Sequence, residues 1–94
     1  MKLADFDLLE TEIPKGVQAV LDFGKYELSI VQHSFSYGGT QGLYEIAVFE
    51  DARQVELPGI TAEGDTVKGF LTEKEIDAII KKMFTITQQE PVQI

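Results

Sequence analysis

The segment VKGFLTEKEIDAIIKKMFT, from Val67 to Thr85, decides how this chain folds. Thr72, followed three residues later by Glu75, matches a capping box, in which each side chain bonds the main-chain N–H of the other at the start of a helix. Apolar residues then recur at the i, i+3, i+4, i+7 spacing of one helical stripe. The stripe consists of Ile76, Ile79, Ile80 and Met83. The pattern predicts an α-helix over about residues 72–84 that packs by this stripe.

Alternating apolar residues upstream predict a β-hairpin. Val17 to Phe23 alternates, Gly24-Lys25 fits a two-residue loop, and Tyr26 to Ile30 continues the alternation on the return strand. Leu43 to Glu50 is predicted to be a third strand with apolar residues on both faces. Such a strand is central in its sheet, or has its second face covered by the N-terminal segment or by another chain.

These elements predict an α+β fold: an antiparallel β-meander of three to five strands with one C-terminal helix on one face. Gln54 to Leu57 would add a short strand, and Val67 to Leu71 either a strand or an extended lead into the helix. A chain of 94 residues without a linker predicts a single domain, residues 1–94. Residues 1–12 carry no decisive pattern. Residues 86–94 are expected to form a flexible tail, with β-addition to a partner as the alternative.

The acidic composition narrows the classes of partner. The net charge is −8, and the only adjacent pair of basic residues is Lys81-Lys82, which argues against a nucleic-acid surface. DNA mimicry is the alternative, but the acidic residues are scattered and interrupted by lysines. The longest apolar run, Ile46 to Phe49, is too short to cross a bilayer, and the acidic N-terminus does not match a signal peptide. A cytoplasmic protein without membrane contact is therefore expected.

Catalytic and metal-binding patterns are missing from the sequence. The chain has no cysteine and a single histidine, His33, which excludes thiolate and multi-histidine metal sites. Paired carboxylates at Asp5 and Asp7, and at Glu50 and Asp51, could serve a hard cation or acid–base chemistry, but no third ligand accompanies them. We therefore expect no enzyme activity, no metal and no cofactor. A small hydrolase or nucleotide enzyme built on these carboxylates ranks last.

The loop from Ser34 to Gly42 is the candidate interaction site. Its glycines let the main chain approach a ligand closely, and its two aromatic residues belong to the types enriched at interaction hot spots. It contains no lysine or arginine and does not match a phosphate-binding pattern. The alternative is a glycine-rich hairpin loop whose aromatic side chains fold back onto the sheet. The candidate partner-binding residues are Phe35, Tyr37, Gly38, Gly39, Thr40 and Gln41.

Two segments, SYGGTQGLYEIAVFED at residues 36–51 and VELPGITAEGDTVKGFLTEKEIDAIIKKM at residues 55–83, resemble small proteins of unassigned role carried by tailed bacteriophages and prophages. The resemblance covers about half of the chain and contains no catalytic residue to carry over. It implies a phage accessory protein that acts in a bacterial cytoplasm by binding a protein. Non-catalytic binding of a protein partner is thus the expected function. A structural or assembly homo-oligomer, in which another copy covers the doubly apolar third strand, is the alternative.

Overall fold

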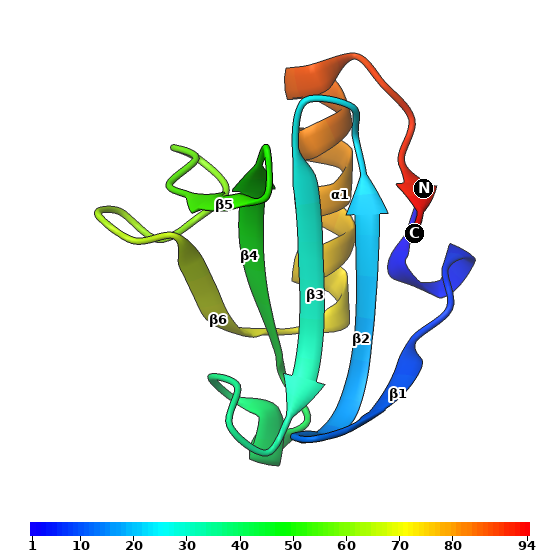
Figure 1. Ribbon diagram of the computed structural model, residues 1–94, viewed down its shortest axis with the longest axis vertical. Coiled ribbons are helices and arrows are strands. Elements are labelled where there is room, and N and C mark those ends of the chain that lie inside the picture. Colours follow the sequence, from blue (N-terminus) through cyan, green and yellow to red (C-terminus); the bar gives the residue numbers. More distant parts are fainter.

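Three long strands form the centre of an antiparallel sheet in the computed structural model, which describes residues 1–94 (Figure 1). They are β2 (Lys15–Asp22), β3 (Glu27–His33) and β4 (Tyr44–Glu50), in that order. The main-chain N–H of Phe23 donates to the carbonyl of Tyr26 at 2.8 Å across the turn between β2 and β3. This contact confirms the predicted hairpin.

Of these three strands, β2 and β4 each have a free edge, and each pairs there with two short strands. β1 (Leu9–Glu12) and β7 (Val92–Gln93) pair with β2, while β5 (Arg53–Val55) and β6 (Val67–Leu71) pair with β4. The sheet therefore has seven strands rather than the predicted three to five. The additional strands are too short to show an alternating pattern in the sequence, and they form because a long neighbour offers an unpaired edge.

The C-terminal helix, α1 (Glu73–Thr87), begins at the predicted residue. The main-chain N–H of Glu75 donates to the Thr72 hydroxyl at 3.2 Å, and the N–H of Thr72 donates to Glu75 Oε1 at 3.0 Å, which confirms the capping box. The helix runs to Thr87 instead of residue 84, and it ends where Gln88 adopts a left-handed conformation. No helix has the length and apolar character needed to cross a membrane.

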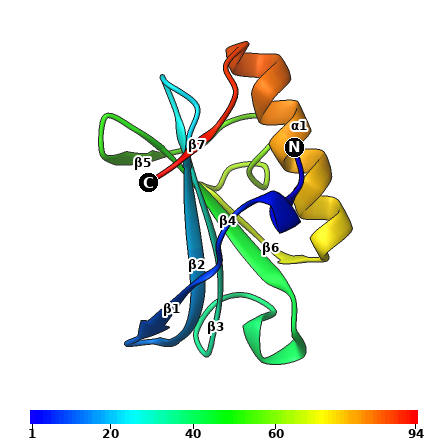
Figure 2. The ribbon, with the colours of Figure 1, turned by 90° about the vertical axis from the view of Figure 1, so that its right-hand side faces the viewer.

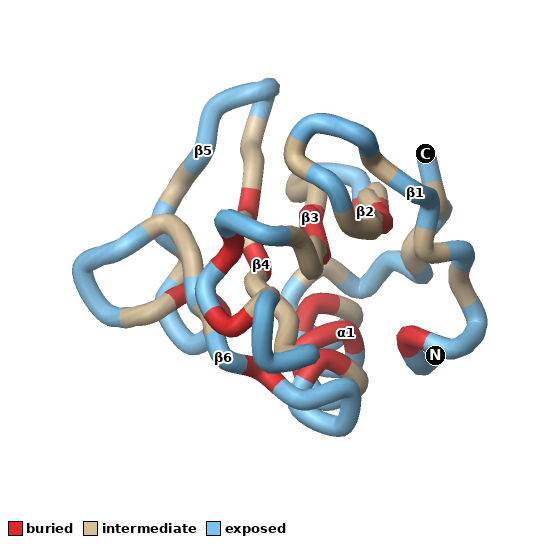
Figure 3. Tube along the Cα trace, turned by 90° about the horizontal axis from the view of Figure 1, so that it is seen from below, coloured by how far each residue is buried: buried red, intermediate tan, exposed pale blue.

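The helical stripe supplies one half of the hydrophobic core, as predicted, and the inner face of the sheet supplies the other. Figure 3 shows buried residues on the three central strands and on α1. Burial of one such aliphatic side chain contributes about 1.5–3 kcal/mol, more than the helix cap at about 1 kcal/mol. The packed residues include Ile76, Ile79, Ile80 and Met83 of the helix, Leu28 and Ile30 of β3, and Ile46 and Val48 of β4.

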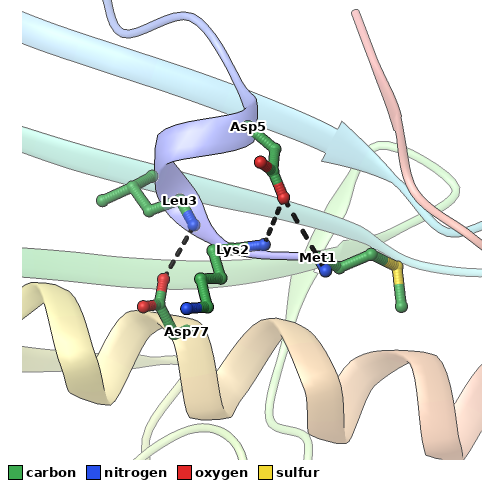
Figure 4. A network of polar contacts seen from close by, with 5 residues as sticks. All are labelled: Met1, Lys2, Leu3, Asp5 and Asp77. Atoms are coloured by element: carbon green, nitrogen blue, oxygen red, sulfur yellow. Dashed lines mark hydrogen bonds and ion pairs between the residues drawn. The ribbon is translucent and has the colours of Figure 1, made fainter.

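Both chain ends are joined to this core. The N-terminal segment forms a short 3-10 helix, η1 (Leu3–Asp5), whose Leu3 side chain is buried and whose Leu3 N–H donates to Asp77 of α1 (Figure 4). The expected flexible tail at residues 86–94 instead continues α1 and then forms β7. The main-chain N–H of Ile94 donates to the Val20 carbonyl at 3.0 Å, so the C-terminus extends the sheet edge.

Candidate interaction site

Main-chain contacts hold the loop that joins β3 to β4. The Ser36 hydroxyl accepts from the His33 N–H at 3.0 Å and donates to the His33 carbonyl at 3.0 Å. The Gly39 N–H donates to the Ser36 carbonyl at 3.0 Å, and the Leu43 N–H donates to the Gly38 carbonyl at 3.0 Å. The loop backbone is thus fixed by its own hydrogen bonds, and it determines where its side chains lie.

Three exposed aromatic side chains lie on the loop between β3 and β4 and on the neighbouring strand β6, and we call them the aromatic tip. Phe35 is 83% exposed, Tyr37 is 56% exposed, and Phe70 of β6 is 55% exposed. The rings of Tyr37 and Phe70 are stacked, with centroids 6.3 Å apart and an interplanar angle of 18°. Of the two loop aromatics, Phe35 stays exposed, whereas Tyr37 folds back against Gly69 and Phe70 of β6. The alternative arrangement, in which the loop aromatics fold back onto the sheet, therefore holds for Tyr37 but not for Phe35.

The stack depends on close approach of two main-chain segments. The Phe70 N–H donates to the Tyr37 carbonyl at 3.1 Å, and the Tyr37 N–H donates to Glu45 Oε1 at 2.8 Å. At Gly69, a β-carbon would collide with the Tyr37 side chain. Glycine is required there, because any other residue would push the two segments apart.

Phe70 has an unusual backbone conformation for a bulky residue. Its φ angle is +57°, in the left-handed region, next to an irregularity in the pairing of β4 with β6. This conformation costs a non-glycine residue about 1–2 kcal/mol. Such strain concentrates at functional sites, where the surrounding structure enforces it. Phe70 therefore combines exposure of its ring with a strained backbone, which makes it a candidate site residue.

The sequence did not identify Phe70 as part of this site. Tyr37 and Phe70 are far apart in the chain, and no local pattern connects them. The available signal was Gly69 inside a short strand, since glycine in a strand interior marks a bulge or a close backbone approach. His33 also contributes here, because its ring Nδ1 accepts the N–H of Phe35 at 3.2 Å and helps to orient that residue.

The other predicted site residues surround the aromatic tip. Gly38 is buried against β6 and has a φ angle of +86°, so it shapes the loop instead of contacting a partner directly. Gly39, Thr40 and Gln41 form a short 3-10 helix, η2, in which Thr40 and Gln41 are exposed. The structure thus leaves two aromatic and two polar side chains of the predicted set exposed on one loop and adds Phe70, which stacks on Tyr37.

The paired carboxylates do not converge. Asp5 accepts the Lys2 N–H in the N-terminal turn, whereas Glu50 faces Lys25 at 3.6 Å beside the turn between β4 and β5. These two regions lie on opposite sides of the molecule (Figure 1). No three His, Asp or Glu side chains lie together in an arrangement that could hold a metal ion.

A further exposed apolar side chain lies in the turn beside the loop that joins β3 to β4. The turn between β1 and β2 is joined to the loop through the Ser34 N–H, which donates to the Lys15 carbonyl at 3.3 Å. Ile13 in that turn is 96% exposed. Figures 1 and 2 both show the turn and the loop at the same end of the molecule. Exposed apolar side chains gathered in this way are typical of interaction surfaces.

No family model matches the chain, and comparisons with curated proteins and with solved structures gave no match.

Proposed function

We propose that this protein is a non-catalytic binding module that engages a protein partner through the aromatic tip. The observation that carries the proposal is the Tyr37–Phe70 stack, in which both side chains are more than half exposed. Aromatic side chains with fixed positions are the preferred anchors of protein interfaces, because they bury a large area while losing little conformational entropy.

Energetics support a binding role for these residues. Leaving an aromatic side chain in water forgoes about 1.5–3 kcal/mol of burial, and the left-handed Phe70 adds about 1–2 kcal/mol of strain. The Tyr37–Phe70 stack recovers part of the burial term, but these side chains lie outside the core cluster and stay more than half exposed. A partner that covers the rings would recover the rest of the burial term on binding.

The class of partner follows from the charge of the chain and from its resemblance to phage proteins. A net charge of −8 opposes binding to nucleic acids and to anionic membrane surfaces. The resemblance of residues 36–83 to small proteins of tailed bacteriophages supports a protein of the bacterial host, or of the phage itself, as the partner. In this proposal the protein acts by occupying a surface of that partner.

The test is quantitative capture from a bacterial lysate with immobilised protein, followed by mass spectrometry. The Phe35→Ala/Tyr37→Ala variant should remain folded, because both side chains are mostly exposed, and it should lose most of the captured partner. The matched control is Ile86→Ala, which removes a 43% exposed apolar side chain from α1 and should capture as well as the unmodified chain. Equal capture by all three proteins would contradict the proposal.

A further inference from the structure

The sheet has a second face that no element of the chain covers. The helix α1 and the segment η1 lie on one side of the sheet, and the other side is open (Figure 2). We call this open side the outer face. Side chains alternate between the two faces along each strand, so the strand register assigns every residue to one of them.

The centre of the outer face is a row of three apolar residues and one serine that crosses four strands. Register pairs Val20 with Ser29, Ser29 with Ala47, and Ala47 with Val67. The Ser29 hydroxyl accepts from the Gln18 side-chain amide at 3.0 Å, so the polar group in this row already has a partner. Val31 and Phe49 lie on the same face, and exposed Leu9, Val92 and Ile94 extend it along the edge of β2.

Charge on the outer face has one sign. Asp22 and Glu27 are directly opposite each other on β2 and β3, and Glu45 lies on the same face. None of the three forms an ion pair, because Lys25 turns to Glu50 instead. Like charges directly opposite each other in a sheet are destabilising, so the Asp22–Glu27 pair lacks a compensating cation within the chain.

We propose that the outer face binds a basic amphipathic helix of a protein partner. Its apolar side would lie on the row through Ala47, and its lysine or arginine side chains would reach Asp22 and Glu27. The helix would run parallel to the strands and cross this row. Its length then fits the face, since a strand of seven residues such as β3 is about 23 Å long and a helix of about 14 residues is about 21 Å long. The occupied sheet would then carry a helix on each face. This proposal does not depend on the aromatic tip.

Charge also decides against a second copy of this chain as the occupant. Two outer faces packed together would enclose the carboxylates of both copies without a lysine or arginine on either face. Enclosing unpaired carboxylates carries a large desolvation penalty. A homo-oligomer built on this face is therefore disfavoured, and so is an anionic lipid surface.

The experiment uses the whole chain and a synthetic amphipathic helix of leucine and lysine, about 14 residues long. NMR spectra of the labelled protein should show shifts of the Val20, Ser29, Ala47 and Val67 amides as the peptide is added. A leucine–glutamate peptide of the same pattern should cause none. Glu27→Gln should weaken peptide binding about twofold to fivefold, the range expected for one surface charge, and should raise the Tm by removing the repulsion with Asp22.

Glu63→Gln is the matched control, because it removes an equal charge from an exposed loop between β5 and β6, outside the strands that form this face. It should leave the peptide affinity unchanged. If both variants weakened peptide binding equally, the peptide would be responding to the net charge of the chain and not to this face, and the proposal would be overturned. Shifts confined to Tyr37 and Phe70 would also overturn it. A dimer detected by light scattering and dissociated by Val20→Lys would assign the face to a second copy instead.

Discussion

The main-chain N–H of Leu3 donates to Oδ1 of Asp77 at 2.7 Å, which joins the start of the chain to its C-terminal helix (Figure 4). Leu3 is only 2% exposed and belongs to the core cluster. Without Asp77, this N–H would lose its acceptor in a partly buried place. The bond therefore fixes η1 over one side of α1 and closes that end of the core.

Asp77→Ala should lower the free energy of unfolding by about 1–3 kcal/mol, the range for removing a charged acceptor from a partly buried N–H. Asp77→Asn retains a side-chain carbonyl oxygen and should lose less. Urea denaturation measures both values. Glu90→Ala, an exposed carboxylate in the C-terminal segment, is the control, and a loss in Asp77→Ala no larger than in this control would contradict the role of the bond.

The sequence was sufficient for the elements whose signals are local. The capping box, the helical stripe and the alternating hairpin each lie within one segment, and all three are present in the structure. The short strands β5 and β6 also lie in segments that the sequence indicates. The edge strands β1 and β7 and the Leu3–Asp77 bond could not be predicted in the same way, because each depends on a partner elsewhere in the chain. The same reason explains why Tyr37 was identified while Phe70, its stacking partner, was not.

The capping box should make the free energy of unfolding depend on pH in the acid range. Hydrogen bonds from the Thr72 N–H and hydroxyl hold the pKa of Glu75 below its ordinary value of 4.5. Because the folded pKa is lower than the unfolded one, this stabilisation is complete above pH 4.5 and is lost as the pH falls through the folded pKa. Glu75→Gln can keep the box but cannot titrate.

The free energy of unfolding of the two proteins should therefore differ by a constant amount near neutral pH, and this difference should change once the pH falls below 4.5. The unmodified chain should lose stability relative to Glu75→Gln in that range. Urea denaturation at several pH values gives both curves. Parallel curves through the acid range would show that the cap does not lower the pKa of the Glu75 carboxyl.

Two isoleucines of α1 provide a matched test of helix docking. Ile79 is 8% exposed and Ile86 is 43% exposed. Ile79→Asp should abolish cooperative unfolding because it buries an unpaired carboxylate. Ile86→Asp should cost only about 1 kcal/mol from helix propensity and the helix dipole. Near-ultraviolet circular dichroism with thermal melting distinguishes these outcomes, and a folded Ile79→Asp variant would contradict the docked position of the helix.

Two substitutions at Phe70 distinguish the cost of its left-handed backbone from the loss of the stack on Tyr37. Phe70→Leu and Phe70→Asn both remove the stack on Tyr37, but asparagine accepts the left-handed conformation more readily than leucine does. The asparagine variant should therefore be more stable than the leucine variant by about 1 kcal/mol, although leucine is the better strand residue in most places.

Both variants should capture less partner than the unmodified chain, because binding in this proposal needs the ring. If the leucine variant were the more stable of the two, the left-handed backbone would not be a source of strain. If either variant captured normally, Phe70 would not belong to the binding surface.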